Sequence, residues 1–395
     1  MKLLFKFLKN KIFFIIIFSL LVLFFTNDFG LIDIEKTAIF TAVAIDKEDD
    51  LYKVSAQIAL PEEKESKKED KKSIISGSGN TVGNAIKNIG DVSGWFPKLS
   101  FCNLIIIGSD LKNENVVNIL DYFAKSQRIQ DSALVVMAEK NASDILKSAS
   151  PLDSISSFAI QKIILKDSGF DKDIATVNVK TFITDYYSPS SSCYMPIVKS
   201  IPVENESMGG QKSGGGQQNE QQSKEENKTA LFDATTTALF KNGLYVGEID
   251  KDLSFSYNLL FNNVEQTVIA VNDVDDINYL LTVLKCKTKY SLSADEYGLY
   301  GKIDINAYCK ISDANAPNID NADQTEYTIP VSVKEKAQKT IKERVEMLIL
   351  KAKETGCDVM KINEKLYRHN YRYYNKYKDD YLSKTNFTIS VKVFN

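Results

Sequence analysis

The stretch LIIIGSDLKNENVVNILDYFA, residues 104–124, contains the pattern that decides the fold class. It opens with a continuous apolar run that stops at Gly108, which is typical of a strand buried on both faces. Apolar residues then recur at helical spacing from Asn113 to Ala124. These are Val116, Val117, Leu120 and Phe123. The stretch therefore predicts a buried strand followed by an amphipathic helix.

The same alternation continues downstream of this stretch. Residues 133–138 predict a second strand and residues 142–149 a second helix. Alternating strands and helices of this length predict an α/β or α+β domain over residues 28–203. The pattern does not decide whether these residues form one domain or two.

Upstream, residues 36–60 alternate with a period of two on both sides of the acidic run Asp46–Asp50. This predicts a β-hairpin with a solvated acidic turn. Residues 76–83 contain three glycines ahead of a helical stretch. They lack the lysine and glycine spacing of a phosphate-binding loop, so we expect a flexible lead-in to a helix with Thr81 as its N-cap.

Residues 204–228 differ in composition from the rest of the chain. They consist largely of Gly, Gln, Glu, Ser, Asn and Lys, which cannot build an apolar core. We expect a flexible low-complexity linker here, separating the N-terminal region from a C-terminal domain over residues 229–395.

The C-terminal domain is predicted to be α+β, with strands packed on one long helix. The helix is expected over residues 334–355, with an apolar stripe and Gly356 as its C-cap. A hairpin turn is expected at Asn242-Gly243. Strands are expected at residues 236–240, 244–249, 267–271, 280–285, 301–309, 328–333 and 387–394.

Residues 1–27 have the charge pattern of a signal or membrane anchor. Lysines precede an apolar run from Ile12 to Phe25, and acidic residues follow it, which predicts an N-terminus inside the cell. The end of the run has bulky residues where signal peptidase needs small ones, and no cysteine for lipidation. These features favour a retained single transmembrane helix over a cleaved signal peptide. The fold class is thus α+β, with mixed sheets and packed helices after this helix.

The composition argues against several classes of function. The net charge of −3 lacks the basic excess of a nucleic-acid-binding protein. His369 is the one histidine and lies near no nucleophile motif, which disfavours hydrolase chemistry. The five scattered cysteines fit neither a disulfide scaffold nor a metal site. The sequence does not decide whether Cys286 and Cys309 form a disulfide bridge. We expect no catalytic residues, no cofactor and no metal.

A tyrosine-rich stretch near the C-terminus, residues 365–381, is the candidate interaction surface. Its tyrosines recur at helical spacing among cationic residues, which suits stacking on a glycan or a lipid headgroup. The alternative interpretation is an aromatic helix face packed on the sheet with solvated cations. The candidate residues are Tyr367, Arg368, Tyr371, Arg372 and Tyr374.

Several short segments follow one another in a recognisable order along the chain. They are Asp33–Ala38, Ile45–Lys47, Leu104–Gly108, Ile119–Phe123, Ala142–Leu146, Ala238–Lys241 with Val246-Gly247, and Cys357–Val359 with Lys365–Arg368. No segment is specific alone, but their order and spacing over most of the chain resemble those of the C subunits of bacterial spore germinant receptors, the Ger(x)C type.

The chain departs from the family pattern at identifiable positions. Asp28 stands where the family usually has a lipidated cysteine, so the chain is lipoprotein-like without the cysteine that carries the lipid. Lys361 and Asn363 replace glycines, while Tyr374 and Tyr381 replace tryptophans. The aromatic exchanges preserve ring burial, whereas the missing cysteine leaves the apolar helix as the anchor.

The resemblance implies a non-enzymatic, membrane-anchored accessory subunit of a nutrient germinant receptor. Its implied partners are the A and B membrane subunits, and its implied place is the outer face of the spore inner membrane. The surface expected to contact partners is the hairpin and loop at Ile39–Lys72. The alternative is an anchored solute- or glycan-binding protein that uses the tyrosine-rich stretch. The sequence does not decide the nutrient, the stoichiometry or direct small-molecule binding.

Overall fold

The computed structural model describes most of the chain in thirteen ranges. These are residues 11, 13–22, 36–59, 74–125, 129–148, 150–153, 155–165, 173–203, 229–261, 264, 267–272, 277–314 and 328–395. The predicted linker 204–228 and Asp28 lie outside them. Residues 13–22 are helical, and their large apolar side chains are exposed. Among the described residues, no helix is both long and apolar enough to span a membrane.

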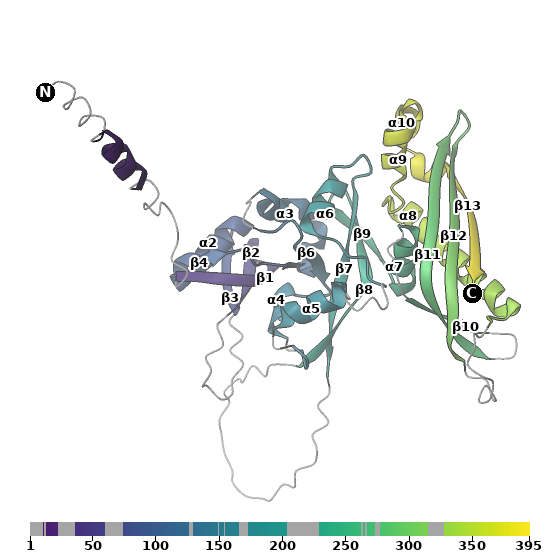
Figure 1. The fold of residues 1–395 in the computed structure, drawn as a ribbon, viewed down its shortest axis with the longest axis horizontal. Helices are drawn as coiled ribbons and strands as arrows, with labels where there is room; N and C mark the ends of the chain where they lie inside the picture. The colour runs from purple at the N-terminus through teal and green to yellow at the C-terminus, as the bar shows by residue number, and fades with distance from the viewer. Residues whose placement is uncertain are drawn as a thin grey trace, which may run out of the picture.

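A nine-stranded mixed sheet forms the first half of the structure (Figure 1). Its order is β3-β2-β1-β5-β6-β7-β8-β9, and β4 pairs with β1. Strand β5 is buried along its whole length, as the apolar run predicts. The strands are β1 Thr37–Glu48, β2 Leu51–Ile58, β3 Ile74–Gly79, β4 Phe96–Lys98, β5 Leu104–Ile107, β6 Leu134–Ala138, β7 Ser192–Pro202, β8 Ala230–Lys241 and β9 Leu244–Ile249.

Helices cover both faces of this sheet (Figure 1). Apolar side chains of α2, α3 and α6 share one core with Ile105 and Ile107 of β5. Those of α4 and α5 share another core with Leu104 and Ile106. Successive side chains of β5 therefore pack alternately into the two cores, one on each face of the sheet. The helices are α2 Val82–Ser93, α3 Val116–Lys125, α4 Ala142–Lys147, α5 Ser156–Leu165 and α6 Val179–Tyr186.

The predicted hairpin is β1–β2, but its turn is shorter than expected. Only Asp49 and Asp50 form it, both with positive φ. Asp46, expected in a solvated turn, is 4 % exposed. Its carboxylate accepts hydrogen bonds from the backbone N–H groups of Ala142 at 2.6 Å and Ser143 at 2.9 Å, so it caps α4. The expectation of a solvated Asp46 was wrong because its partners lie almost a hundred residues away.

The glycine-rich segment before α2 is a strand rather than a flexible lead-in. Residues 74–79 form β3, which pairs antiparallel with β2. A Cβ atom at Gly77 would lie 2.6 Å from the carbonyl oxygen of Ala85, so the glycine lets α2 pack directly on the strand. Thr81 caps α2 as predicted, accepting from the N–H of Asn84.

A second sheet, with order β10-β11-β12-β13, packs on the long helix α8. Val331 begins α8 directly after Pro330, so the strand predicted at 328–333 was wrong. Gly356 ends α8 in a left-handed conformation, as predicted. The elements are β10 Thr267–Asn272, β11 Asn278–Ala294, β12 Leu299–Ala314, β13 Thr385–Phe394, α7 Lys251–Leu260, α8 Val331–Thr355, α9 Ile362–His369, α10 Tyr371–Tyr377 and α11 Tyr381–Lys384.

The chain after residue 228 first extends the first sheet. Strand β8 pairs with β7, and the predicted Asn242-Gly243 turn joins β8 to β9. Leu239 of β8 and Ile249 of β9 share the apolar core of α7, α8 and the second sheet. The two sheets are therefore joined through a continuous core. The observed architecture confirms the predicted α+β class with mixed sheets.

Candidate functional site

The tyrosines of the predicted interaction surface lie on two short helices, α9 and α10. Asn370 breaks the helical pattern between α9 and α10. The ring centroids of Tyr367, Tyr371 and Tyr374 lie 5.2 to 5.9 Å apart, and Tyr371 stacks on Tyr374 at 13°. The side chains of Tyr367 and Tyr371 are about half exposed. The three rings contact one another face to face and edge to face, which favours local packing over an open stacking platform.

The two predicted arginines have partners outside this tyrosine cluster. Arg368 forms an ion pair with Glu364 at 2.7 Å, one helical turn away. The guanidinium of Arg372 lies 5.6 Å from the ring centroid of Tyr373. The structure thus brings the three tyrosines together and directs both arginines elsewhere.

A buried carboxylate joins the two halves of the chain. Asp358 is 1 % exposed and lies in the turn between α8 and α9. Its side chain accepts hydrogen bonds from the N–H groups of Ile362 and Asn363, both at 2.9 Å, and from the Ser190 hydroxyl at 2.7 Å. The Asp358 N–H donates to the Ser192 hydroxyl at 2.9 Å. We call Asp358 with Ser190 and Ser192 the Asp358 cluster.

Burial shapes the electrostatics of the Asp358 cluster. Loss of solvent raises the pKa of Asp358, and the two N–H donors of α9 partly oppose this. Burial lowers the pKa of Lys241, whose ammonium donates to the Ser190 carbonyl at 2.6 Å. A charged carboxylate with three donors, one of them from the other half of the chain, is costly to separate from its partners.

A second pair of contacts reinforces the junction. Lys361 forms an ion pair at 2.9 Å with Asp185 of α6, which is largely buried. The Asn363 amide donates to the Pro189 carbonyl at 2.8 Å. Lys361 has a φ of 51°, a left-handed conformation that suits the glycine usual at this position in the resembling family. Lys361 and Asn363, which stand where the family usually has glycines, thus both form polar contacts between the halves.

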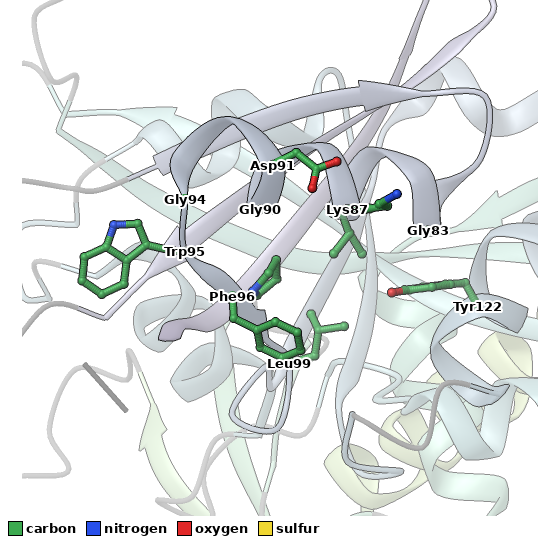
Figure 2. Close-up of a pocket in the computed structure, with 11 residues that line it drawn as sticks. Gly83, Lys87, Gly90, Asp91, Gly94, Trp95, Phe96, Leu99 and Tyr122 are labelled. Carbon is green, nitrogen blue, oxygen red and sulfur yellow. The ribbon is translucent and has the colours of Figure 1, made fainter. Parts of the chain in front are cut away.

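A surface pocket of about 460 Å³ lies between α2, β4 and α3 (Figure 2). Leu99 is buried at its base, whereas Phe96 and Trp95 are partly exposed. Lys87 and Asp91 of α2 line it as well, and Tyr122 of α3 reaches toward it from the other side. No motif in the sequence predicted this pocket. The one signal for it is the single tryptophan of the chain, in the run Ser-Gly-Trp-Phe.

The five cysteines are buried, unbonded thiols, so Cys286 and Cys309 are not bridged. In strand register Cys309 lies opposite Val283, while Cys286 lies opposite Ala307. Burial raises the pKa of each cysteine thiol. Within the described ranges, no group of three or more His, Cys, Asp or Glu side chains is placed to hold a metal ion.

The residues that join the halves stand in no functional motif of the sequence. Asp358 lies within the resembling segment Cys357–Val359, and no motif marks Ser190 or Asp185. Their spacing along the chain, 168 positions between Ser190 and Asp358, carries no local pattern that predicts contact.

Comparisons with known proteins agree with this architecture. Residues 31–200 match the family model described as "Spore germination protein N-terminal domain", and residues 235–394 match "Spore germination B3/ GerAC like, C-terminal". A solved structure described as "Crystal Structure of the GerBC protein" has a TM-score of 0.53 and 17% identity, over 92% of this chain and 99% of that chain. This similarity shows a shared fold. A search of curated proteins gave no match.

The two family models lie in order along the chain. The first ends within β7 and the second begins within β8, and these two strands pair with each other. The α+β fold agrees with that of the similar solved structure. The chain belongs to the Ger(x)C family, the C subunits of spore germinant receptors.

Proposed function

We propose that this chain is the non-enzymatic accessory subunit of a nutrient germinant receptor and couples nutrient sensing to the start of spore germination. The observation that carries the proposal is the match of both halves of the chain, in order, to spore germination domains. The partners in this proposal are the two integral-membrane subunits, A and B.

The Asp358 cluster supports a coupling role. Ser190, before β7, donates a charge-assisted hydrogen bond to the buried Asp358 carboxylate, and the Asp358 N–H, in the turn before α9, donates to the Ser192 hydroxyl of β7. The Lys361–Asp185 ion pair adds a further link from the N-cap of α9 to α6. Contacts of this kind favour movement of the two halves as one body, so displacement at one end is passed to the other.

We further propose that the chain is held on the outer face of the spore inner membrane by its N-terminal apolar segment. The support is the lysine-rich flank, the apolar run Ile12–Phe25 and the acidic residues after it. The helical, exposed apolar residues 13–22 are consistent with insertion in lipid. Asp28 in place of the family's usual cysteine leaves this helix as the attachment.

Isolation from spore membranes tests the partners and the attachment together. A tagged full-length chain is purified in mild detergent after formaldehyde crosslinking. Recovery of two multi-span germinant receptor subunits is the expected result. Recovery of a solute permease instead would favour the anchored solute-binding protein. Alkaline carbonate provides the control for attachment, since release of the full-length chain would contradict a retained helix.

A further inference from the structure

Four large apolar side chains are exposed along the segment from the end of α2 to the turn before β5. Val92 lies in the last turn of α2, Trp95 follows that helix, Phe96 begins β4, and Phe101 lies between β4 and β5. Val92 is 80 % exposed, Phe101 50 %, Trp95 47 % and Phe96 38 %. We call these four residues the apolar tip. Large apolar side chains that gather at one place on a surface mark an interaction site more often than scattered ones do.

The backbone fixes the apolar tip at one edge of the fold. Gly94 ends α2 in a left-handed conformation with its N–H bonded to the Gly90 carbonyl, which turns the chain toward Trp95. The Cys102 N–H bonds to the Leu99 carbonyl and closes the turn that carries Phe101. Both turns are short and hydrogen-bonded, so the backbone that carries Trp95 and Phe101 is already ordered, and binding needs little further loss of backbone entropy.

The apolar tip lies where the folded part of the chain begins. Phe96 pairs with Thr37, the first residue of β1. The apolar run Ile12–Phe25 ends twelve residues before Thr37, a distance of about 40 Å at most for an extended chain. The start of β1 is therefore the part of the first sheet most closely tethered to that run. Figure 1 shows α2 and β4 at this end, with β11 and β12 at the opposite end.

The chemistry of the apolar tip suits the bilayer interface. Tryptophan concentrates at the level of lipid headgroups because its ring is apolar and its N–H is polar, and phenylalanine and valine enter the adjoining acyl region. The indole of Trp95 lies at the outer edge of the pocket, whereas Phe96 borders the pocket (Figure 2). The apolar face of an amphipathic helix bound at this boundary is buried by about 5–10 Å, and we expect a similar depth for the apolar tip.

We propose that the apolar tip inserts in the headgroup region of the bilayer that holds the N-terminal segment. It thereby orients the folded part of the chain, with α2 and β4 toward the membrane and the β11–β12 end away from it. This inference rests on the proposed attachment. It goes further by assigning the membrane-facing surface of the fold.

Trp95 is the single tryptophan of the chain and reports on its own surroundings. The full-length chain is reconstituted in vesicles of equimolar phosphatidylcholine and phosphatidylglycerol. We expect lipids brominated near the headgroup to reduce Trp95 fluorescence by about half, and aqueous iodide to have little effect, given the expected depth of insertion. Phe101→Ser and Val92→Ser, both at exposed positions, should weaken the bromolipid effect.

A matched control moves the reporter to the other end. Tyr297 is 90 % exposed between β11 and β12. In a Trp95→Phe background, the Tyr297→Trp chain should respond to iodide and not to brominated lipid.

The outcomes separate this inference from the proposed attachment. If the chain floats with the vesicles while Trp95 responds only to iodide, the attachment stands and the apolar tip proposal is wrong. If neither brominated lipid nor iodide quenches Trp95, a protein surface covers the apolar tip and the proposal is wrong. The same conclusion follows if Trp95 is shielded from iodide only after the membrane subunits are added. A chain that does not float contradicts the attachment and with it the proposal.

Discussion

The Ser190 hydroxyl donates a 2.7 Å hydrogen bond to the buried carboxylate of Asp358, across 168 positions of the chain. The same carboxylate caps the first turn of α9. One side chain therefore satisfies the start of a helix in the C-terminal half and holds the segment that leads into β7. We regard this contact as the mechanical junction between the two family domains.

Removing the Asp358 carboxylate should destabilise the whole chain. Asp358→Ala leaves three buried donors without an acceptor, and we expect the free energy of unfolding to fall by about 3 kcal/mol or more. Urea unfolding measures the change. Asp379→Ala removes an exposed carboxylate from the nearby turn and should stay within about 0.5 kcal/mol of the original chain. Equal losses in the two variants would show that the Asp358 hydrogen bonds contribute little.

The same carboxyl group should make stability depend on pH. Burial raises the pKa of Asp358 above its ordinary value of 3.8, so the folded chain binds this proton more tightly than the unfolded chain does. The resulting stabilisation is fully present below about pH 4 and is lost as the pH rises through the folded-state pKa. Asp358→Asn removes this titration. The unfolding free energy of the original chain minus that of the variant should decrease from acid to neutral pH, and an increase would contradict the direction of the shift.

Lys361 combines a strained backbone with a useful side chain, and two substitutions separate these effects. Lys361→Ala loses the ion pair with buried Asp185 and keeps the left-handed backbone. Lys361→Gly loses the same ion pair but relieves the strain, so it should be more stable than the alanine variant by about 1 kcal/mol. Chemical unfolding measures both.

The control for Lys361 is an ordinary helical lysine. At Lys339, within α8, alanine should be more stable than glycine by about 1 kcal/mol. If the alanine variant were more stable than the glycine variant at position 361 as well, the result would argue against backbone strain at Lys361.

The cysteines should be unreactive while the chain is folded. Burial raises the pKa of Cys102, Cys309 and Cys357 to about 12 each, so thiolate is scarce at neutral pH. A chromogenic thiol reagent should react slowly with the native chain. After unfolding, it should react with all five thiols. A reductant should leave Tm unchanged, since Cys286 and Cys309 are unbonded. A reductant-sensitive Tm would show that a bridge forms.

Local patterns in the sequence predicted much of the fold. The apolar run of β5, the helical spacing of α3, the Thr81 N-cap and the Gly356 C-cap depend on residues close in the chain. Pro330 misled the prediction at 328–333, because β-branched residues follow it and Pro330 is the N-cap of a helix there.

The parts that could not be predicted depend on distant partners. Asp46 looked solvated because its run is acidic, yet it caps α4 nearly a hundred residues later. Asp358 carries no local signal for its contact with Ser190. Tyr367 and Tyr371 were found by their spacing, but spacing could not reveal that their rings pack together across the break at Asn370. Exposure of Trp95 became visible only in three dimensions.

The most direct test of the proposed function is nutrient-triggered germination in spores whose supply of this chain is controlled. The strain lacks the chromosomal gene and any receptor able to substitute, and expresses the chain from a titratable promoter during sporulation. Release of dipicolinic acid after nutrient addition is measured, with a non-nutrient chemical trigger as the control. We predict no nutrient response without the chain, a rate that rises with its amount, and an unchanged response to the chemical trigger. Equal nutrient germination at every level of the chain, including none, would contradict the account.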